Sequence, residues 1–241
     1  MWSNMGFRVI GASLVRASAH GAVLPDYNLI RNNIRTWSGI IRDTRQLGLI
    51  GTSWARGTTF CPPNFNIDLT WPNISYLARR LGRSPQPFWP GLPEATVERL
   101  VTQLGRCRKD WRIESDVIRE MTALRPRLRA HRYEWDSLLS MVRVLAMTRR
   151  VEHAINEVEY FHANVRPVDS EWQRRLDDQA GILHDLVVLR REVRAHFSRR
   201  YRGDAFCEWL RDLFDLREAK LRECSRISRS KLRLAARQYA S

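Results

Sequence analysis

Apolar residues recur at intervals of three and four positions along most of this 241-residue chain, and this spacing constrains the fold more than any other feature. Residues three and four apart lie on one side of an α-helix, so the spacing predicts amphipathic helices. We therefore predict an all-α protein: an irregular helical assembly with an extended N-terminal third and a basic C-terminal helix. The clearest series are Val97, Leu100, Val101 and Leu104, then Trp135, Leu138, Leu139, Val142 and Leu145, and later Phe206, Trp209, Leu210, Leu213 and Phe214.

The N-terminal third is less regular than the rest of the chain. Asp26 is expected to cap a helix that ends around residues 48–51, and Asn73 is expected to cap a short helix. Residues 52–72 and 83–93 are too rich in Pro, Gly and Thr for a continuous helix, and the second stretch is the most proline-rich of the chain. We expect these two stretches to be an extended connector and a linker.

Helix boundaries in the remaining chain follow from breakers and caps. Gly105 suits the end of one helix and Ser115 the start of the next, which Pro126 ends or kinks. Pro167 interrupts the chain before a helix capped by Asp169 or Ser170, and Asp204 opens the last helix. The expected organisation has four parts: an N-terminal segment (1–25), a helix with a proline-rich connector (26–92), a helical core (93–165) and C-terminal helices with a basic tail (166–241).

The N-terminal segment has the composition of a mitochondrial transit sequence. Residues 1–25 include two arginines and several Ser and Ala residues but no acid. In a helical projection Phe7, Ile10 and Leu14 share one side and the arginines lie on the other. We expect a transit-like or retained segment, and we expect the protein in the mitochondrion, on the matrix side.

Net charge limits the classes of partner. The chain has 41 Arg and Lys residues against 26 Asp and Glu residues, a net charge of +15. Self-repulsion of this size opposes compaction, and a polyanion relieves it. Nucleic acid is the first candidate, and an anionic membrane surface is the competitor. Only Lys109, Lys220 and Lys231 are lysines; arginine suits bidentate phosphate contacts, although GC-rich codon usage explains the bias equally well.

The C-terminal tail carries the strongest functional signal. No acid follows Glu223, and arginines recur at spacings of four, three, four and four, which places them on one side of a helix. Like charges at these spacings weaken an isolated helix, so an anionic partner is expected to compensate. Phosphates of an RNA duplex fit that requirement. We call these residues the arginine face: Arg222, Arg226, Arg229, Arg233 and Arg237.

Motifs for catalysis or metal binding are missing from the sequence. It contains no phosphate-binding glycine loop, no G-x-S-x-G and no H-E-x-x-H, so we expect no enzymatic activity, no cofactor and no small-molecule substrate. No stretch is apolar enough for a transmembrane helix. The cysteines form no C-x-x-C pair, which argues against zinc and indicates thiols in a reducing compartment. They are Cys61, Cys107, Cys207 and Cys224.

Residues 93–158 resemble the fifteenth small-subunit ribosomal protein family, an all-helical RNA-binding fold. The matching stretches are "EATVERLVTQLGR", "ESDVIREMTALRPRL", "LRAH" and "SLLSMVRVLAMTRRVEHAI". In that family a histidine in the loop between long helices contacts ribosomal RNA. The resemblance implies this role for His131, and it matches Arg149 and Arg150 to a basic pair on the third helix.

These observations predict a structural component of the mitochondrial ribosome, more specifically of its small subunit. Arginine-rich helix sides would bind rRNA phosphates, and the proline-rich connector and the N-terminal segment would lie along RNA or neighbouring proteins. The alternative is an accessory subunit of an inner-membrane respiratory or ATP synthase complex. Acids and arginines interleave over residues 169–223, and that pattern favours protein–protein packing.

Overall fold

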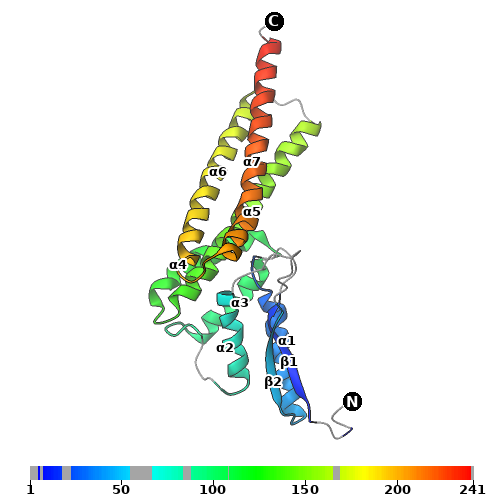
Figure 1. Cartoon of the computed structure of the whole chain (residues 1–241), viewed down its shortest axis with the longest axis vertical. Coiled ribbons are helices and arrows are strands. Elements are labelled where there is room, and N and C mark those ends of the chain that lie inside the picture. Colours follow the sequence, from blue (N-terminus) through cyan, green and yellow to red (C-terminus); the bar gives the residue numbers. More distant parts are fainter. Residues whose placement is uncertain are drawn as a thin grey trace. The chain divides into compact units, whose positions relative to one another are not determined.

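A computed structural model of the chain divides into two compact units, Met1–Arg143 and Val144–Ser241. Seven α-helices against one two-stranded sheet in the described residues confirm the all-α prediction (Figure 1). One helix, α5 (Arg132–Asn164), contains the division between the units. The structure describes residues 5, 8–17, 23–54, 67–83, 88–107, 109–164 and 169–239.

The first unit begins with a strand–helix–strand motif. Strand β1 (Ile10–Ala17) pairs in parallel with β2 (Gly48–Trp54), and helix α1 (Tyr27–Asp43) connects them. A parallel pair requires such a crossover. Asp26 caps α1 as predicted, because its carboxylate accepts a hydrogen bond from the Leu29 backbone N–H at 3.1 Å.

The predicted helix around Ile10 and Leu14 is wrong, because these residues form β1. Burial alternates along the strand: Ser13 and Val15 are buried, whereas Ile10 is 52% exposed. A spacing of four fits one helical turn, but it also fits an even number of strand positions, which share one face of a sheet. Pairing with β2 decides between the two. Phe7 lies outside the described residues.

The second strand also corrects a prediction. The helix expected to reach residues 48–51 ends at Asp43, and β2 begins at Gly48. Of the expected connector 52–72, the first three residues belong to β2, and the last residues form a 3₁₀ turn (Ile67–Thr70) and the start of helix α2 (Trp71–Arg80). Residues 55–66 lie outside the described part of the chain.

Helix α2 (Trp71–Arg80) packs on the strands, and its start differs from the prediction. Asn73 does not cap it: the residue lies inside the helix and is fully buried, and its side-chain amide donates to the Val15 carbonyl at 3.2 Å. Pro72 in the first turn suits a start before Asn73. The resulting core consists of Val15, Ile30, Ile34 and Leu77, with Leu49 and Ile74 packed against it.

Buried polar groups tie α1 to its neighbours. The Tyr27 hydroxyl is buried and donates to the Leu69 carbonyl at 2.6 Å, and burial raises the pKa of this phenol well above its ordinary value. Arg31 pairs with Glu98 of helix α3 (Glu94–Cys107) and lies 4.6 Å from the Tyr76 ring centroid. Burial lowers the pKa of Arg31, and the Glu98 carboxylate opposes that effect.

The rest of the first unit is helical. Helix α3 (Glu94–Cys107) is followed by a 3₁₀ turn (Trp111–Ile113), α4 (Glu114–Leu124), a second 3₁₀ turn (Arg125–Arg127) and the start of α5. Pro126 therefore ends α4, as predicted. Gly105 does not end α3: it is buried inside the helix, where a Cβ atom would overlap the Asn28 side chain of α1. The glycine permits a close approach between helices.

The second unit consists of the remainder of α5 with α6 (Asp169–Phe197) and α7 (Asp204–Tyr239). Asp204 is the first residue of α7, as predicted, and α6 and α7 lie side by side (Figure 1). Fully or almost fully buried side chains hold the helices together: Val151, Val158, Leu186, Val193, Phe214 and Leu221.

Ion pairs between helices accompany this core. Arg150 of α5 contacts Asp185 of α6 at 3.0 Å, and Arg190 of α6 contacts Asp215 of α7 at 2.7 Å. Among the described residues, none of the helices has a stretch apolar and long enough to cross a bilayer.

Candidate nucleic-acid interface

Helix α7 contains the whole arginine face. Its bounds enclose all five arginines, and their spacing places them on one side of the helix. Four of these side chains are exposed; the side chain of Arg237 lies outside the described part of the chain. The prediction of one continuous basic helix side is therefore confirmed for the backbone, and for the side chains of Arg222, Arg226, Arg229 and Arg233.

Two arginines of this face are paired with acids on the same helix. The Arg222 guanidinium donates to Glu218 at 2.7 Å, and Arg226 donates to both carboxylate oxygens of Glu223 at 2.6 and 2.9 Å. The hydrogen bond from Arg226 lowers the pKa of Glu223, and Glu223 raises the pKa of Arg226. Both arginines are exposed, although Glu218 is only 18% exposed. Ion pairs with an exposed arginine contribute little stability, so each arginine can exchange its carboxylate for a phosphate at low cost.

The other described members, Arg229 and Arg233, are exposed one helical turn apart. Within the described residues, the structure records no acidic partner for either side chain. Their donors are available to an external anion, and a guanidinium suits bidentate contact with phosphate oxygens. The part of the face that contains Arg229 and Arg233 is therefore the better anion-binding surface.

A groove of about 390 Å³ runs beside the arginine face, between α6 and α7. Its lining contains no acid: Arg222 and Arg229 of α7 and His184 of α6 accompany small and apolar side chains. Ser225 is buried here and donates to the Gln179 side-chain oxygen at 2.9 Å. The remaining lining residues are Ala180, Leu183 and Val187. The groove combines basic groups with an apolar surface.

Sequence reasoning missed this groove. The spacing of Ala180, Leu183, His184 and Val187 shows one side of α6, but nothing in it shows that α7 packs beside that side. The acidic partners of the arginine face, in contrast, follow from the sequence spacing, because Glu218 precedes Arg222 by four positions and Glu223 precedes Arg226 by three.

The predicted pair Arg149–Arg150 has a different environment. Arg150 is half-exposed and its guanidinium contacts Asp185, so it links α5 to α6. It also lines a second cavity of about 420 Å³ between these helices, together with Glu157, Arg175 and Asp178. Acids and bases alternate in that lining, and Arg175 contacts Glu157 at 3.1 Å. This surface is less suited to phosphate than the arginine face, because its own acids compete for the arginines.

His131 lies in the first unit, at the loop that precedes α5. Its backbone has a positive φ of 58°, and its carbonyl accepts a hydrogen bond from the Trp135 backbone N–H at 3.1 Å. Its imidazole is 45% exposed and lies 3.8 Å from the Glu134 carboxylate. The structure therefore places His131 in the first unit and Arg149–Arg150 in the second.

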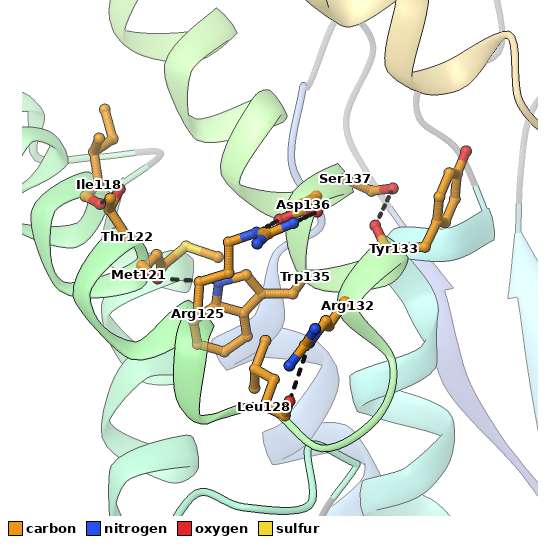
Figure 2. Close-up of polar contacts among 10 residues, drawn as sticks. All are labelled: Ile118, Met121, Thr122, Arg125, Leu128, Arg132, Tyr133, Trp135, Asp136 and Ser137. Atoms are coloured by element: carbon orange, nitrogen blue, oxygen red, sulfur yellow. Dashed lines mark hydrogen bonds and ion pairs between the residues drawn. The ribbon is translucent and has the colours of Figure 1, made fainter.

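The corner between α4 and α5 is held by internal hydrogen bonds (Figure 2). The buried Trp135 indole N–H donates to the Met121 carbonyl at 3.1 Å. Arg125 donates to both carboxylate oxygens of Asp136 at 2.6 and 2.7 Å, and this hydrogen bonding raises the pKa of Arg125. Arg132 donates to the Leu128 carbonyl at 3.1 Å. These contacts fix the loop that carries His131.

Metal-binding groups do not cluster in the described residues: no set of three or more His, Cys, Asp or Glu side chains could hold an ion there. Cys224 is buried, which raises the pKa of its thiol, and Cys207 is exposed. Cys61 lies outside the described part of the chain. Comparison with protein-family models, with curated proteins and with solved structures finds no match for this chain.

Proposed function

We propose that this protein is a structural component of the mitochondrial ribosome, more specifically of its small subunit, and that the arginine face of α7 binds rRNA phosphates. One observation carries the proposal. Between Val144 and Glu223 the second unit has fifteen Arg and Lys residues and fifteen Asp and Glu residues, so it is neutral. Five basic residues and no acid follow Glu223, and all five lie on α7.

This separation of charge lets one part of the second unit fold without net repulsion and leaves the other part basic enough to bind a polyanion. The neutral part forms ion pairs between helices, such as Arg190 with Asp215, and folds without a net repulsion. The excess charge sits on one exposed helix, where it releases counterions from a polyanion on binding. A tail that only kept the protein soluble would not need its arginines on one side of the helix.

The first unit supports the same proposal. It contains 21 Arg and Lys residues against 11 Asp and Glu residues, which is an excess of ten positive charges. The proposed mitochondrial localisation rests on the composition of residues 1–25. Ile10–Ala17 of that segment form a strand, so the composition of the segment, and not an amphipathic helix at these residues, supports the mitochondrial location.

The alternative is an accessory subunit of an inner-membrane respiratory or ATP synthase complex. The neutral, ion-paired helices of the second unit favour it, and so do exposed apolar side chains there: Tyr160 is 62% and Leu216 is 64% exposed. Such side chains suit a protein interface.

Sedimentation of detergent-solubilised mitochondria, with and without ribonuclease, tests the two functions. We expect the chain to migrate with a ribosomal subunit and to leave that fraction after ribonuclease. A variant with Arg229→Gln and Arg233→Gln should be depleted from the particle. The matched control, Arg174→Gln with Arg191→Gln, removes two exposed arginines of α6 and should stay. Migration with a respiratory or ATP synthase complex, unchanged by ribonuclease, would refute the ribosomal function.

A further inference from the structure

Three aromatic rings from distant parts of the first unit form a stack. Phe88 stacks with each of the other two: its ring centroid is 4.3 Å from that of His131, with an interplanar angle of 21°, and 6.5 Å from that of Trp71, with an angle of 6°. Trp71 opens α2, and His131 precedes α5. We call these three residues the aromatic stack.

Burial distinguishes the aromatic stack from the core beneath it. Trp89 and Trp135 are fully buried and pack edge to face at 4.9 Å, and Phe88 meets Trp89 in the same way at 5.5 Å. Two rings of the stack are open to solvent instead: Trp71 is 39% exposed, and the imidazole of His131 is 45% exposed. Core packing accounts for the two buried tryptophans but not for the open rings.

The backbone holds the imidazole in place. His131 occupies the left-handed region, which costs energy for any residue with a side chain, and such residues persist where the surrounding structure fixes them. Here the fixed surroundings are the Arg129 N–H, which donates to the Pro90 carbonyl at 3.0 Å, and the first turn of α5. A pre-positioned ring loses little entropy when another ring stacks on it.

Charge around the stack suits an anionic ligand. Arg129 and Arg132 flank His131 in the sequence and are exposed. Arg129 also lies against Gly91, three residues after Phe88. Glu134, whose carboxylate lies 3.8 Å from the imidazole, is only 7% exposed. An open aromatic ring bordered by exposed arginines is the arrangement that binds single-stranded nucleic acid, in which bases stack and phosphates meet cations.

We propose that the aromatic stack binds an unpaired RNA base, which stacks on the open face of His131 or Trp71 while Arg129 and Arg132 contact the adjoining phosphates. This inference rests on the proposed RNA-binding function, but it concerns a second surface and a different form of RNA. The arginine face recognises phosphates of a duplex; the aromatic stack selects single strands.

The test measures binding of the full-length chain to labelled single-stranded oligoadenylate and to a blunt RNA duplex by fluorescence anisotropy. His131→Asn removes the ring but keeps a residue that tolerates positive φ, whereas His131→Phe keeps an aromatic ring. We expect the variant that removes the ring on which the base stacks, His131→Asn or Trp71→Leu, to weaken oligoadenylate binding about tenfold, because that is a typical loss for one stacked base. His131→Phe should bind normally. Duplex binding should not change in any of these variants.

Controls separate folding from binding and one proposal from the other. Trp111→Leu removes a tryptophan that is 66% exposed outside the stack and should bind like the parent chain. Melting curves identify variants that lose the fold, and His131→Phe then decides the result.

Normal oligoadenylate binding by both His131→Asn and Trp71→Leu overturns the aromatic-stack proposal and leaves the proposal of duplex binding by the arginine face unaffected. Loss of oligoadenylate binding in His131→Phe also overturns the proposal if this variant melts like the parent chain, because a hydrogen bond and not stacking would then be the contact. A parent chain that binds neither RNA overturns both proposals.

Discussion

Arg229 and Arg233 should dominate RNA binding by the arginine face. Arg222 and Arg226 must first exchange a carboxylate for a phosphate, whereas the structure records no acidic partner for Arg229 or Arg233 among the described residues. We therefore predict that Arg229→Gln with Arg233→Gln weakens duplex binding more than Arg222→Gln with Arg226→Gln. Both double variants remove two positive charges, so the difference isolates the effect of the internal acids.

The magnitude follows from counterion release. Each phosphate contact on a duplex contributes about −0.9 to the slope of log K against log salt concentration. If Arg229 and Arg233 each contact one phosphate, their removal should make the slope shallower by about 1.8. When the salt concentration rises fourfold, both the variant and the parent chain lose affinity for the duplex. The factor lost by the variant should be about twelve times smaller than the factor lost by the parent chain. The Arg222 and Arg226 variant should change the slope less.

Titration of a labelled RNA duplex with the full-length chain at several salt concentrations measures these slopes. Glu223→Gln serves as the opposite perturbation: it frees Arg226 without adding a base, so affinity should rise at low salt. Arg174→Gln with Arg191→Gln, on α6, should leave the slope close to that of the parent chain. Equal slopes for all double variants would refute the reasoning, because binding would then depend only on total charge.

Three further predictions concern stability. Gly91→Ala should lower the melting temperature by several degrees, from a loss of about 2 kcal/mol, because Gly91 has a φ of 100° and a Cβ atom would overlap the Arg127 carbonyl oxygen. Tyr27 has a raised pKa in the folded state, so above about pH 10 the folded chain keeps a proton that the unfolded chain releases. The free energy of unfolding should therefore not change through this group below about pH 10, and it should fall as the pH rises above that value. The fall should be smaller in Tyr27→Phe. Urea titrations across that pH range measure the difference, and a parallel fall in both chains would contradict the assignment. Arg190→Gln should reduce the unfolding free energy by about 0.5–1 kcal/mol, since its two acidic contacts on α7 are partly exposed; no change in denaturant midpoint would show that the pair is not stabilising.

Local patterns predicted the helices that follow Pro93 because the information for an amphipathic helix is contained within a few turns. Asp26 and Asp204 were identified as helix starts for the same reason, since a cap acts on backbone groups two or three residues away. The arginine face depends only on spacing and helical periodicity. Its acidic partners follow the same local rule.

The misassignments share one cause: a distant partner decided the conformation. Ile10 lies in a strand because it pairs opposite Gly48, far along the chain. Asn73 is buried in α2 because the Val15 carbonyl of β1 accepts its amide hydrogen. Gly105 stays inside α3 because α1 packs against it. No window of sequence contains both members of any of these contacts.

Composition and periodicity therefore decide that this chain is basic, largely helical and charged along one side of its last helix, because each property depends on neighbouring residues or on none. Only the tertiary structure decides which surfaces are continuous. It brings α6 beside Arg222 and Arg229 to form a groove, and it stacks His131 on Phe88 and Trp71. Those contacts join residues whose separation along the chain carries no periodic signal, and only packing of the hydrophobic core brings them together.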